Sequence, residues 1–174
     1  MISRRELLKK STLFLGGTLL LPDVLKAWES PAIENLSFVI GDVQSQLIAE
    51  IAELIIPTTD TPGAKAAGVP AFIQKILVDC FNSKDRKDFF DGLDFFEKML
   101  TTQTGKSFLQ HSQTEQIVFL KAAQNEYFFK TLKDLTITGY FSSEIGATQA
   151  LRYEEIPGRY DGDLLYKKGD KAWG

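Results

Sequence analysis

The chain has 174 residues, 44% of them hydrophobic, and a formal net charge of −3 with a pI near 5.3. This acidic balance, without a stripe of Lys and Arg able to follow a phosphate backbone, excludes nucleic acid as an expected partner. A single cysteine, Cys80, excludes an internal disulfide, a haem-attachment pair and a cysteine-based zinc cluster.

The N-terminal residues carry a motif typical of protein export. Residues 3–9 read S-R-R-E-L-L-K and resemble the twin-arginine signal S/T-R-R-x-F-L-K, with Leu7 where Phe is commonest. The positions that would be recognised by the twin-arginine translocase are Arg4, Arg5, Leu8 and Lys9.

An apolar run follows at residues 11–21 and is too short to cross a bilayer core of ~30 Å, which needs roughly 20 apolar residues. We therefore expect a signal peptide over 1–27, a linker over 28–41, and export of the protein to the periplasm. General secretory signals and membrane anchors share this layout, so cleavage after Ala27 and retention as an anchor are both open.

Hydrophobic periodicity and helix-boundary signals predict an all-α domain over 42–174, a small helical bundle. The expected helices cover residues 43–56, 70–81, 84–102, 113–124 and 126–141. Their expected start signals are Asp42, Pro70, Ser83 and the capping box Ser112–Glu115. Their expected stop signals include Pro57 and Gly105.

The connection between the first two helices is rich in turn-forming residues. Residues 58–68 read T-T-D-T-P-G-A-K-A-A-G, and Pro62-Gly63 is the expected tight turn. Asp60 is expected to cap or brace this turn.

The expected core includes a stripe of apolar residues along the third helix and another along the fifth. The members of these stripes are Phe89, Leu93, Phe96, Leu100, Phe128, Leu132, Leu135 and Tyr140. Adjacent phenylalanines occur at 89–90, 95–96 and 128–129, and neighbours on a helix point ~100° apart. One ring of a pair can thus serve a second packing surface, although core packing within the domain is favoured. Cys80 follows an apolar string and is expected to be buried.

Helical periodicity ends near Ser142, and we expect a long irregular C-terminal arm from there. Residues 146–174 hold five glycines and four large aromatic residues. Pure disorder usually lacks such aromatics, so an arm packed on the domain or on a partner is favoured over a mobile tail.

No catalytic, cofactor-binding or metal-binding residues are expected. His111 is the only histidine, no G-x-S-x-G or G-x-G-x-x-G motif accompanies it, and no carboxylate is expected at helical spacing from it. A satisfied surface or capping histidine is expected. The acidic residues at 85, 88, 91 and 94 drift by ~60° per step, which predicts a solvated charged face.

An ordered set of short motifs resembles the small subunit, subunit 3, of the gluconate 2-dehydrogenase family. The motifs are L-I-I-P-T-T-D-T-P-G-A at 54–64, A-G-V at 67–69, D-G-L at 91–93, Y-F-S-S-E-I-G at 140–146 and I-P-G-R-Y at 156–160. The resemblance covers roughly residues 43–173.

This resemblance implies a non-catalytic subunit that binds a large GMC-type dehydrogenase carrying FAD. Such a dehydrogenase oxidises a sugar or sugar acid and passes electrons to a cytochrome c subunit with haem c or to another acceptor. The small subunit carries the export signal and escorts the folded flavoprotein. We expect the loop, the arm and part of the surface formed by the paired phenylalanines to make the partner interface, with candidate residues Asp60, Pro62, Gly63, Tyr153, Pro157, Tyr160 and Trp173. The resemblance also implies that the chain is associated with the inner membrane through this complex.

Two alternatives belong to other classes of protein. One is an independent exported helical domain, with a binding or structural role and no oxidoreductase partner. The other is a self-sufficient enzyme that uses Asp60, His111 and the aromatics of the arm.

Overall fold

A computed structural model of the chain describes residues 39–156, 158–159, 162–163, 165 and 167–173. The leader residues Arg4, Arg5, Leu8 and Lys9, and the interface candidates Pro157 and Tyr160, lie outside these described residues.

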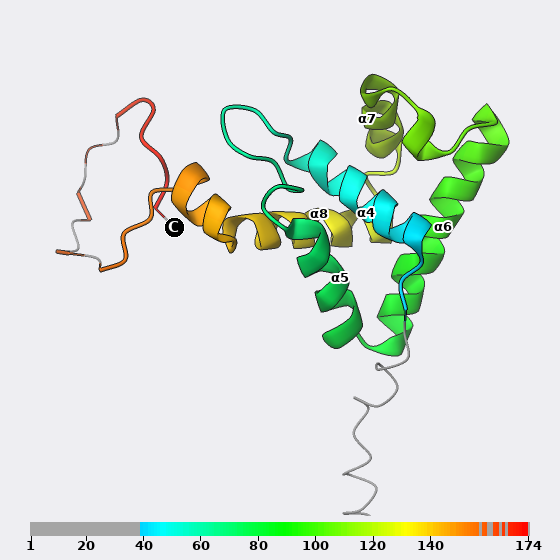
Figure 1. Ribbon diagram of the computed structural model, residues 1–174, viewed down its shortest axis with the longest axis horizontal. Coiled ribbons are helices and arrows are strands. Elements are labelled where there is room, and N and C mark those ends of the chain that lie inside the picture. Colours follow the sequence, from blue (N-terminus) through cyan, green and yellow to red (C-terminus); the bar gives the residue numbers. More distant parts are fainter. Residues whose placement is uncertain (1–38, 157, 160–161, 164, 166, 174) are drawn as a thin grey trace, which may run out of the picture. The chain divides into compact units, whose positions relative to one another are not determined.

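The described part is all-α, as predicted, and no strand occurs in it (Figure 1). The elements in chain order are α4 Asp42–Ile55, α5 Val69–Asp79, α6 Ser83–Thr104, the 3-10 turn η1 Phe108–Gln110, α7 Gln113–Ala122, α8 Tyr127–Phe141 and the π-helical turn η2 Gly146–Ala150. None of the described helices combines the length and apolar character needed to cross a bilayer.

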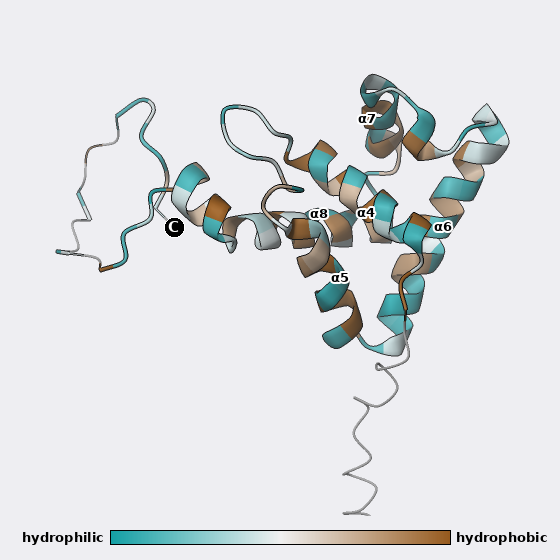
Figure 2. Cartoon of the chain, in the orientation of Figure 1, coloured by the Kyte–Doolittle hydropathy of each residue, from teal (hydrophilic) through white to brown (hydrophobic). Residues whose placement is uncertain are grey.

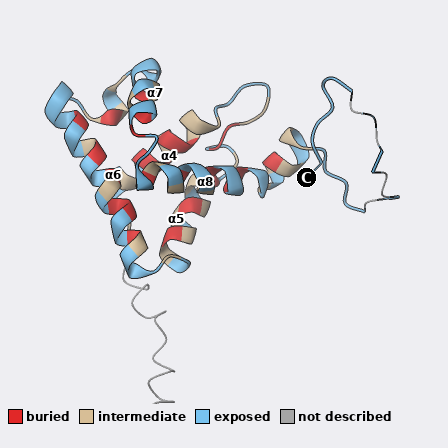
Figure 3. Cartoon of the chain, turned by 180° about the vertical axis from the view of Figure 1, so that it is seen from behind, coloured by how far each residue is buried: buried red, intermediate tan, exposed pale blue. Residues whose placement is uncertain are grey.

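Helix α8 is the central element of the bundle, because α4, α5 and α6 all pack against it. Along α4, α5, α6 and α8 most buried positions are apolar residues that recur on one side of the helix, whereas the buried residues of α7 are Gln116 and Leu120 (Figures 2 and 3). The largest fully buried side chains are Tyr140, Phe89, Phe108, Leu47, Ile48, Ile51, Ile73, Leu77, Leu93, Leu100, Leu132 and Val69. The predicted inward stripes are thus confirmed, except that Leu135 is half-buried.

Two predicted helix caps are wrong by one residue. Gly41, not Asp42, is the N-cap of α4, and its amide donates to the Gln44 side chain at 3.2 Å. Asn82, not Ser83, caps α6, and its Oδ1 accepts from the Asp85 amide at 2.8 Å. The capping box Ser112–Glu115 and the left-handed Gly105 at the end of α6 are confirmed.

The phenylalanine pairs differ from one another. Phe89 and Phe90 are both buried, with ring centroids 5.1 Å apart, because α6 contacts α4, α8 and η1 and has a wide buried face. In the next pair Phe96 is buried while Phe95 is 68% exposed, which leaves one large ring on the surface.

The end of α5 corrects the expectation for Cys80, which is exposed. The helix ends at Asp79, and Cys80 is its C-cap, outside the apolar stripe. Arg86 is buried instead, and its guanidinium donates to the Val78 carbonyl at 3.0 Å, which fastens the end of α5 to the start of α6.

The C-terminal arm begins later than predicted. Helical turns continue through Ala150, and irregular structure starts at 151 rather than 142. Ser143 lies at the break between α8 and these turns, and its hydroxyl accepts from the Gly146 amide at 3.0 Å, as in a helix N-cap.

Candidate functional site

The connection between α4 and α5, residues 57–68, is organised around the carboxylate of Glu53. One oxygen of Glu53 accepts from the Thr58 amide at 3.0 Å and from the Thr58 hydroxyl at 2.8 Å. The other oxygen accepts from the Lys65 amide at 2.8 Å. The Thr58 hydroxyl in turn accepts from the Gly63 amide at 3.0 Å. Both ends of the loop are therefore fastened to one side chain of α4.

These contacts set the charge state of Glu53. Burial raises the pKa of its carboxyl, but the hydrogen bonds from Lys65 and Thr58, with the Lys65 charge, outweigh burial and hold the pKa below its ordinary value of 4.5. The carboxylate is thus stabilised in its ionised form, which is the form that accepts all three hydrogen bonds.

Gly63 is required by close packing rather than by an unusual backbone angle. A Cβ atom at this position would lie 2.3 Å from Glu53 Oε1 and 2.6 Å from the Thr58 backbone nitrogen. The absence of a side chain therefore allows the turn to close on Glu53. The tight turn predicted at Pro62-Gly63 lies a little later in the chain, at residues 64–68, where the Gly68 amide donates to the Lys65 carbonyl at 3.1 Å.

A second contact that holds the loop comes from a residue far along the sequence, in α8. Tyr140 of α8 is 2% exposed, and its hydroxyl donates to the Pro62 carbonyl at 2.8 Å, across 78 residues of sequence. Ala64 is fully buried, and its amide donates to the Ile56 carbonyl at 2.9 Å. The base of the loop is therefore part of the core.

The tip of the loop faces solvent. Asp60 is exposed and accepts from the Thr59 hydroxyl at 2.8 Å, so the expectation that Asp60 braces its own turn is confirmed. The Thr59 hydroxyl is the largest cause that lowers the pKa of Asp60, and the positive charge of Lys171 adds to it. The tip therefore presents a fixed negative charge.

Trp173 and Tyr153 lie on the arm and are both about half exposed, at 54% and 55%. The Arg152 guanidinium stacks 3.9 Å from the Trp173 ring centroid, and the Arg152 amide donates to the Ala172 carbonyl at 2.7 Å. The Lys171 ammonium donates to the Gln149 carbonyl. Residues 149–152 and 171–173 of the arm are thus held to one another.

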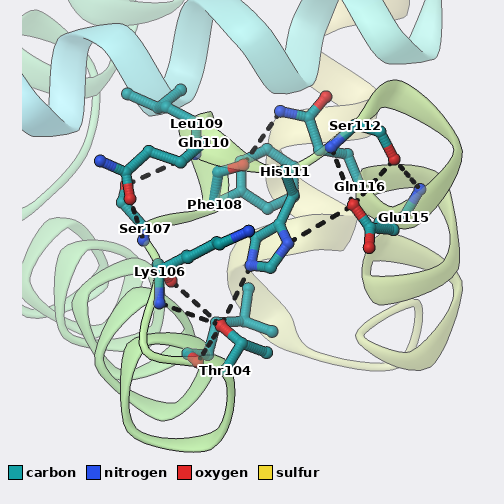
Figure 4. Close-up of polar contacts among 11 residues, drawn as sticks. Thr104, Lys106, Ser107, Phe108, Leu109, Gln110, His111, Ser112, Glu115 and Gln116 are labelled. Carbon is teal, nitrogen blue, oxygen red and sulfur yellow. Dashed lines mark hydrogen bonds and ion pairs between the residues drawn. The ribbon is translucent and has the colours of Figure 1, made fainter.

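His111 lies in the connection between α6 and α7 (Figure 4). Its side chain is only 5% exposed. One ring nitrogen is 3.0 Å from the Thr104 hydroxyl, and the other is 3.6 Å from a Glu115 oxygen that also accepts from the Ser112 amide at 2.9 Å. Phe119 packs edge-on against the ring at a centroid distance of 5.0 Å.

This geometry corrects one expectation and supports another. A carboxylate does lie at helical spacing from His111, namely Glu115. The histidine is nonetheless a satisfied cap, as predicted, although its side chain is buried rather than on the surface. In the described part of the chain, no group of three or more His, Cys, Asp or Glu side chains is arranged to hold a metal ion.

The charged face of α6 is confirmed as a set of local pairs. Lys84 pairs with Asp88 at 2.8 Å, Lys87 pairs with Asp91, and Asp94 accepts from Gln44 at 2.9 Å. These carboxylates do not converge on a common point.

The apolar surface left by Phe95 continues along α6. Phe95 and Met99, which is 38% exposed, border a groove of about 320 Å³ that Phe119 and Ala122 of α7 close on the other side. The split phenylalanine pair in the sequence signalled this surface.

Glu53 is the residue that sequence reasoning missed. It lies near the C-terminal end of α4, where the helix dipole disfavours negative charge. An acidic residue in such a place signals a partner elsewhere, and here the partners are the amides of the loop.

Comparison with known families gives one match. The family model described as gluconate 2-dehydrogenase subunit 3 matches residues 42–158. The match includes α4 to η2 and the whole of the Glu53-fastened loop. Comparisons with curated proteins and with solved structures give no match.

Proposed function

Because this chain belongs to the gluconate 2-dehydrogenase subunit 3 family, we propose that it is the non-catalytic small subunit of a periplasmic sugar or sugar-acid dehydrogenase complex. Its direct partner is a large GMC-type flavoprotein that holds FAD and performs the oxidation. Electrons leave through a cytochrome c subunit with haem c or through another acceptor. The family match over most of the helical body carries this proposal.

The small subunit contributes binding energy rather than chemistry. A protein that binds only the folded form of a partner stabilises that form by mass action, by about 2.7 kcal/mol at a hundredfold excess over Kd. A permanent complex of this kind buries roughly 1,600 Å² or more. The twin-arginine motif at residues 3–9 gives the complex its export route, through which the folded flavoprotein crosses with its escort.

The interface includes the exposed tip of the loop and the aromatic arm. Asp60 offers a fixed carboxylate, with Pro62 and Gly63 holding the turn behind it. Tyr153 and Trp173 offer half-exposed rings, the residue type most enriched among interface anchors.

Affinity purification of the full chain from its native envelope, with an absorbance spectrum of the eluate, tests the proposal. The expected result is co-elution of a larger protein with flavin absorbance, and added haem bands would identify the acceptor. Asp60→Ala and Trp173→Ala should each reduce the recovered flavin. Asp79→Ala, an exposed acidic change at the end of α5, is the matched control.

A colourless chain that elutes alone under gentle conditions would contradict the proposal and favour an independent helical domain. Oxidation of an added sugar by the purified chain alone would favour a self-sufficient enzyme. Full recovery of flavin with both variants would keep the complex but move the interface away from the loop and arm.

A further inference from the structure

A second groove lies where the end of α4 meets α7 and the first half of α8, and it has a volume of about 560 Å³. Its apolar lining consists of the buried Leu120 and four large side chains that are only half-buried: Leu54, Ile55, Ile117 and Phe129. Its polar lining includes three exposed lysines, Lys121, Lys130 and Lys133, and one exposed acid, Asp134. We call this the lysine groove.

The three lysines have no ion pair with any residue that the structure describes. Asp134 stands at i+4 from Lys130, a spacing that permits a helix pair, yet the two do not come within 4 Å. Among the other described lysines, Lys75 pairs with Asp79 and Lys84 with Asp88, whereas Lys98 and Lys106 form no ion pair with a described residue.

The two carboxylates in the second half of α4, Glu50 and Glu53, already have partners in the connection between α4 and α5. Glu50 pairs with Lys65, and Glu53 accepts the three hydrogen bonds of the loop. Within the described residues the groove therefore has three lysines without an ion pair beside one acid, Asp134, in a chain whose net charge is −3. An apolar floor with cationic edges is complementary to an acidic amphipathic segment.

We propose that the lysine groove docks an acidic amphipathic segment of the partner flavoprotein. Apolar side chains of that segment cover Leu54, Ile117 and Phe129, and its carboxylates pair with the lysines. This inference rests on the proposed function and names a surface outside the loop and the arm. Because Leu54 and Ile55 lead directly into the loop, the groove extends the same interface around the end of α4.

A lipid surface fits the groove less well. A flat bilayer does not enter a concave site lined by three helices, and lipid-binding clusters usually hold 4–8 Lys or Arg rather than three beside an acid. A protein segment can contact the apolar lining and the three lysines of the groove at the same time.

The experiment uses the flavoprotein that co-purifies with the chain as the probe. Lys121→Gln, Lys130→Gln and Lys133→Gln are combined in one variant, and Lys75→Gln, Lys84→Gln and Lys87→Gln in a matched control that removes the same charge from paired lysines. Circular dichroism verifies that both variants are folded. The groove variant should raise Kd about tenfold or more and flatten its dependence on salt, while the control stays within about twofold.

A carbodiimide, which joins amines directly to carboxylates, gives an independent readout. In the wild-type complex it should join Lys121, Lys130 or Lys133 to one acidic segment of the flavoprotein. Equal Kd values for the groove variant and the wild type, with no such cross-links, would overturn the groove while leaving the complex intact.

Two further outcomes are informative. Sedimentation of the chain with phosphatidylglycerol vesicles that is lost in the groove variant would assign the groove to membrane lipid and overturn the proposal. A wild-type chain that binds no flavoprotein at all would overturn both the groove and the proposed function.

Discussion

Replacing Glu53 with Gln tests whether one carboxylate fastens the loop. Gln has a single acceptor oxygen, so it can keep either the Thr58 contacts or the Lys65 contact but not both. Its NH₂ group, a donor, then faces the backbone amide that has lost its acceptor. Hydrogen bonds to a charged group contribute about 1.5–3 kcal/mol. Because Glu53 is only half-buried, solvent screening reduces the expected loss of stability to about 1–2 kcal/mol.

Urea and thermal unfolding measure this loss, at roughly 3–5 °C in Tm per kcal/mol for a domain of this size. Hydrogen exchange should locate it, with faster exchange of the Thr58 and Lys65 amides and little change in α6. Glu50→Gln is the matched control, because Glu50 makes only an exposed pair with Lys65 and should change stability by less than about 1 kcal/mol.

The contribution of Glu53 to the free energy of unfolding is expected to depend on pH. The pKa of Glu53 is lowered in the folded chain, so its contribution is fully present above the ordinary value of 4.5 and is lost as pH falls through the folded pKa. The difference in stability between wild type and Glu53→Gln should therefore be largest near neutral pH and shrink as the pH falls below 4.5. A difference that is equal for the Glu50 control, or that does not change with pH, would refute the role of Glu53.

Three further predictions concern single positions. Tyr140→Phe leaves the Pro62 carbonyl without its donor and should cost about 1–2 kcal/mol in urea unfolding, with faster exchange confined to the loop. Gly63→Ala should cost about 1–3 kcal/mol and weaken partner binding, because the new Cβ meets a backbone nitrogen at 2.6 Å. Phe96→Ala should cost about 3–5 kcal/mol, whereas Phe95→Ala should stay within about 0.5 kcal/mol and change partner binding instead; equal losses would contradict the burial assigned to this pair.

Local patterns predicted most of the bundle. The stripe through Phe89 and Leu93 was visible because side chains on one face of a helix recur every three to four residues, whatever the helix packs against. The capping box at Ser112 and the left-handed Gly105 were visible because each satisfies backbone groups within a few residues.

Features that depend on distant contacts were not predictable in this way. Phe90 is buried because several elements cover α6, which the sequence of α6 alone does not contain. Tyr140 reaches Pro62 across 78 residues, and Glu53 reaches Lys65 across 12. The loop was therefore recognisable as an interface candidate, while the side chains that hold it were not.

The way the loop is held bears on how it would bind. A segment fixed before binding loses little conformational freedom when a partner docks, so more of its contact energy appears as affinity. Glu53, Gly63 and Tyr140 give the loop this property. Among its described residues the arm beyond residue 150 has one isolated bridge and few hydrogen bonds, so ordering it against a partner costs about 0.5–1.5 kcal/mol for each immobilised side chain. Loosening the loop through Glu53→Gln should therefore slow association or raise Kd even though no contacting side chain at the tip is changed.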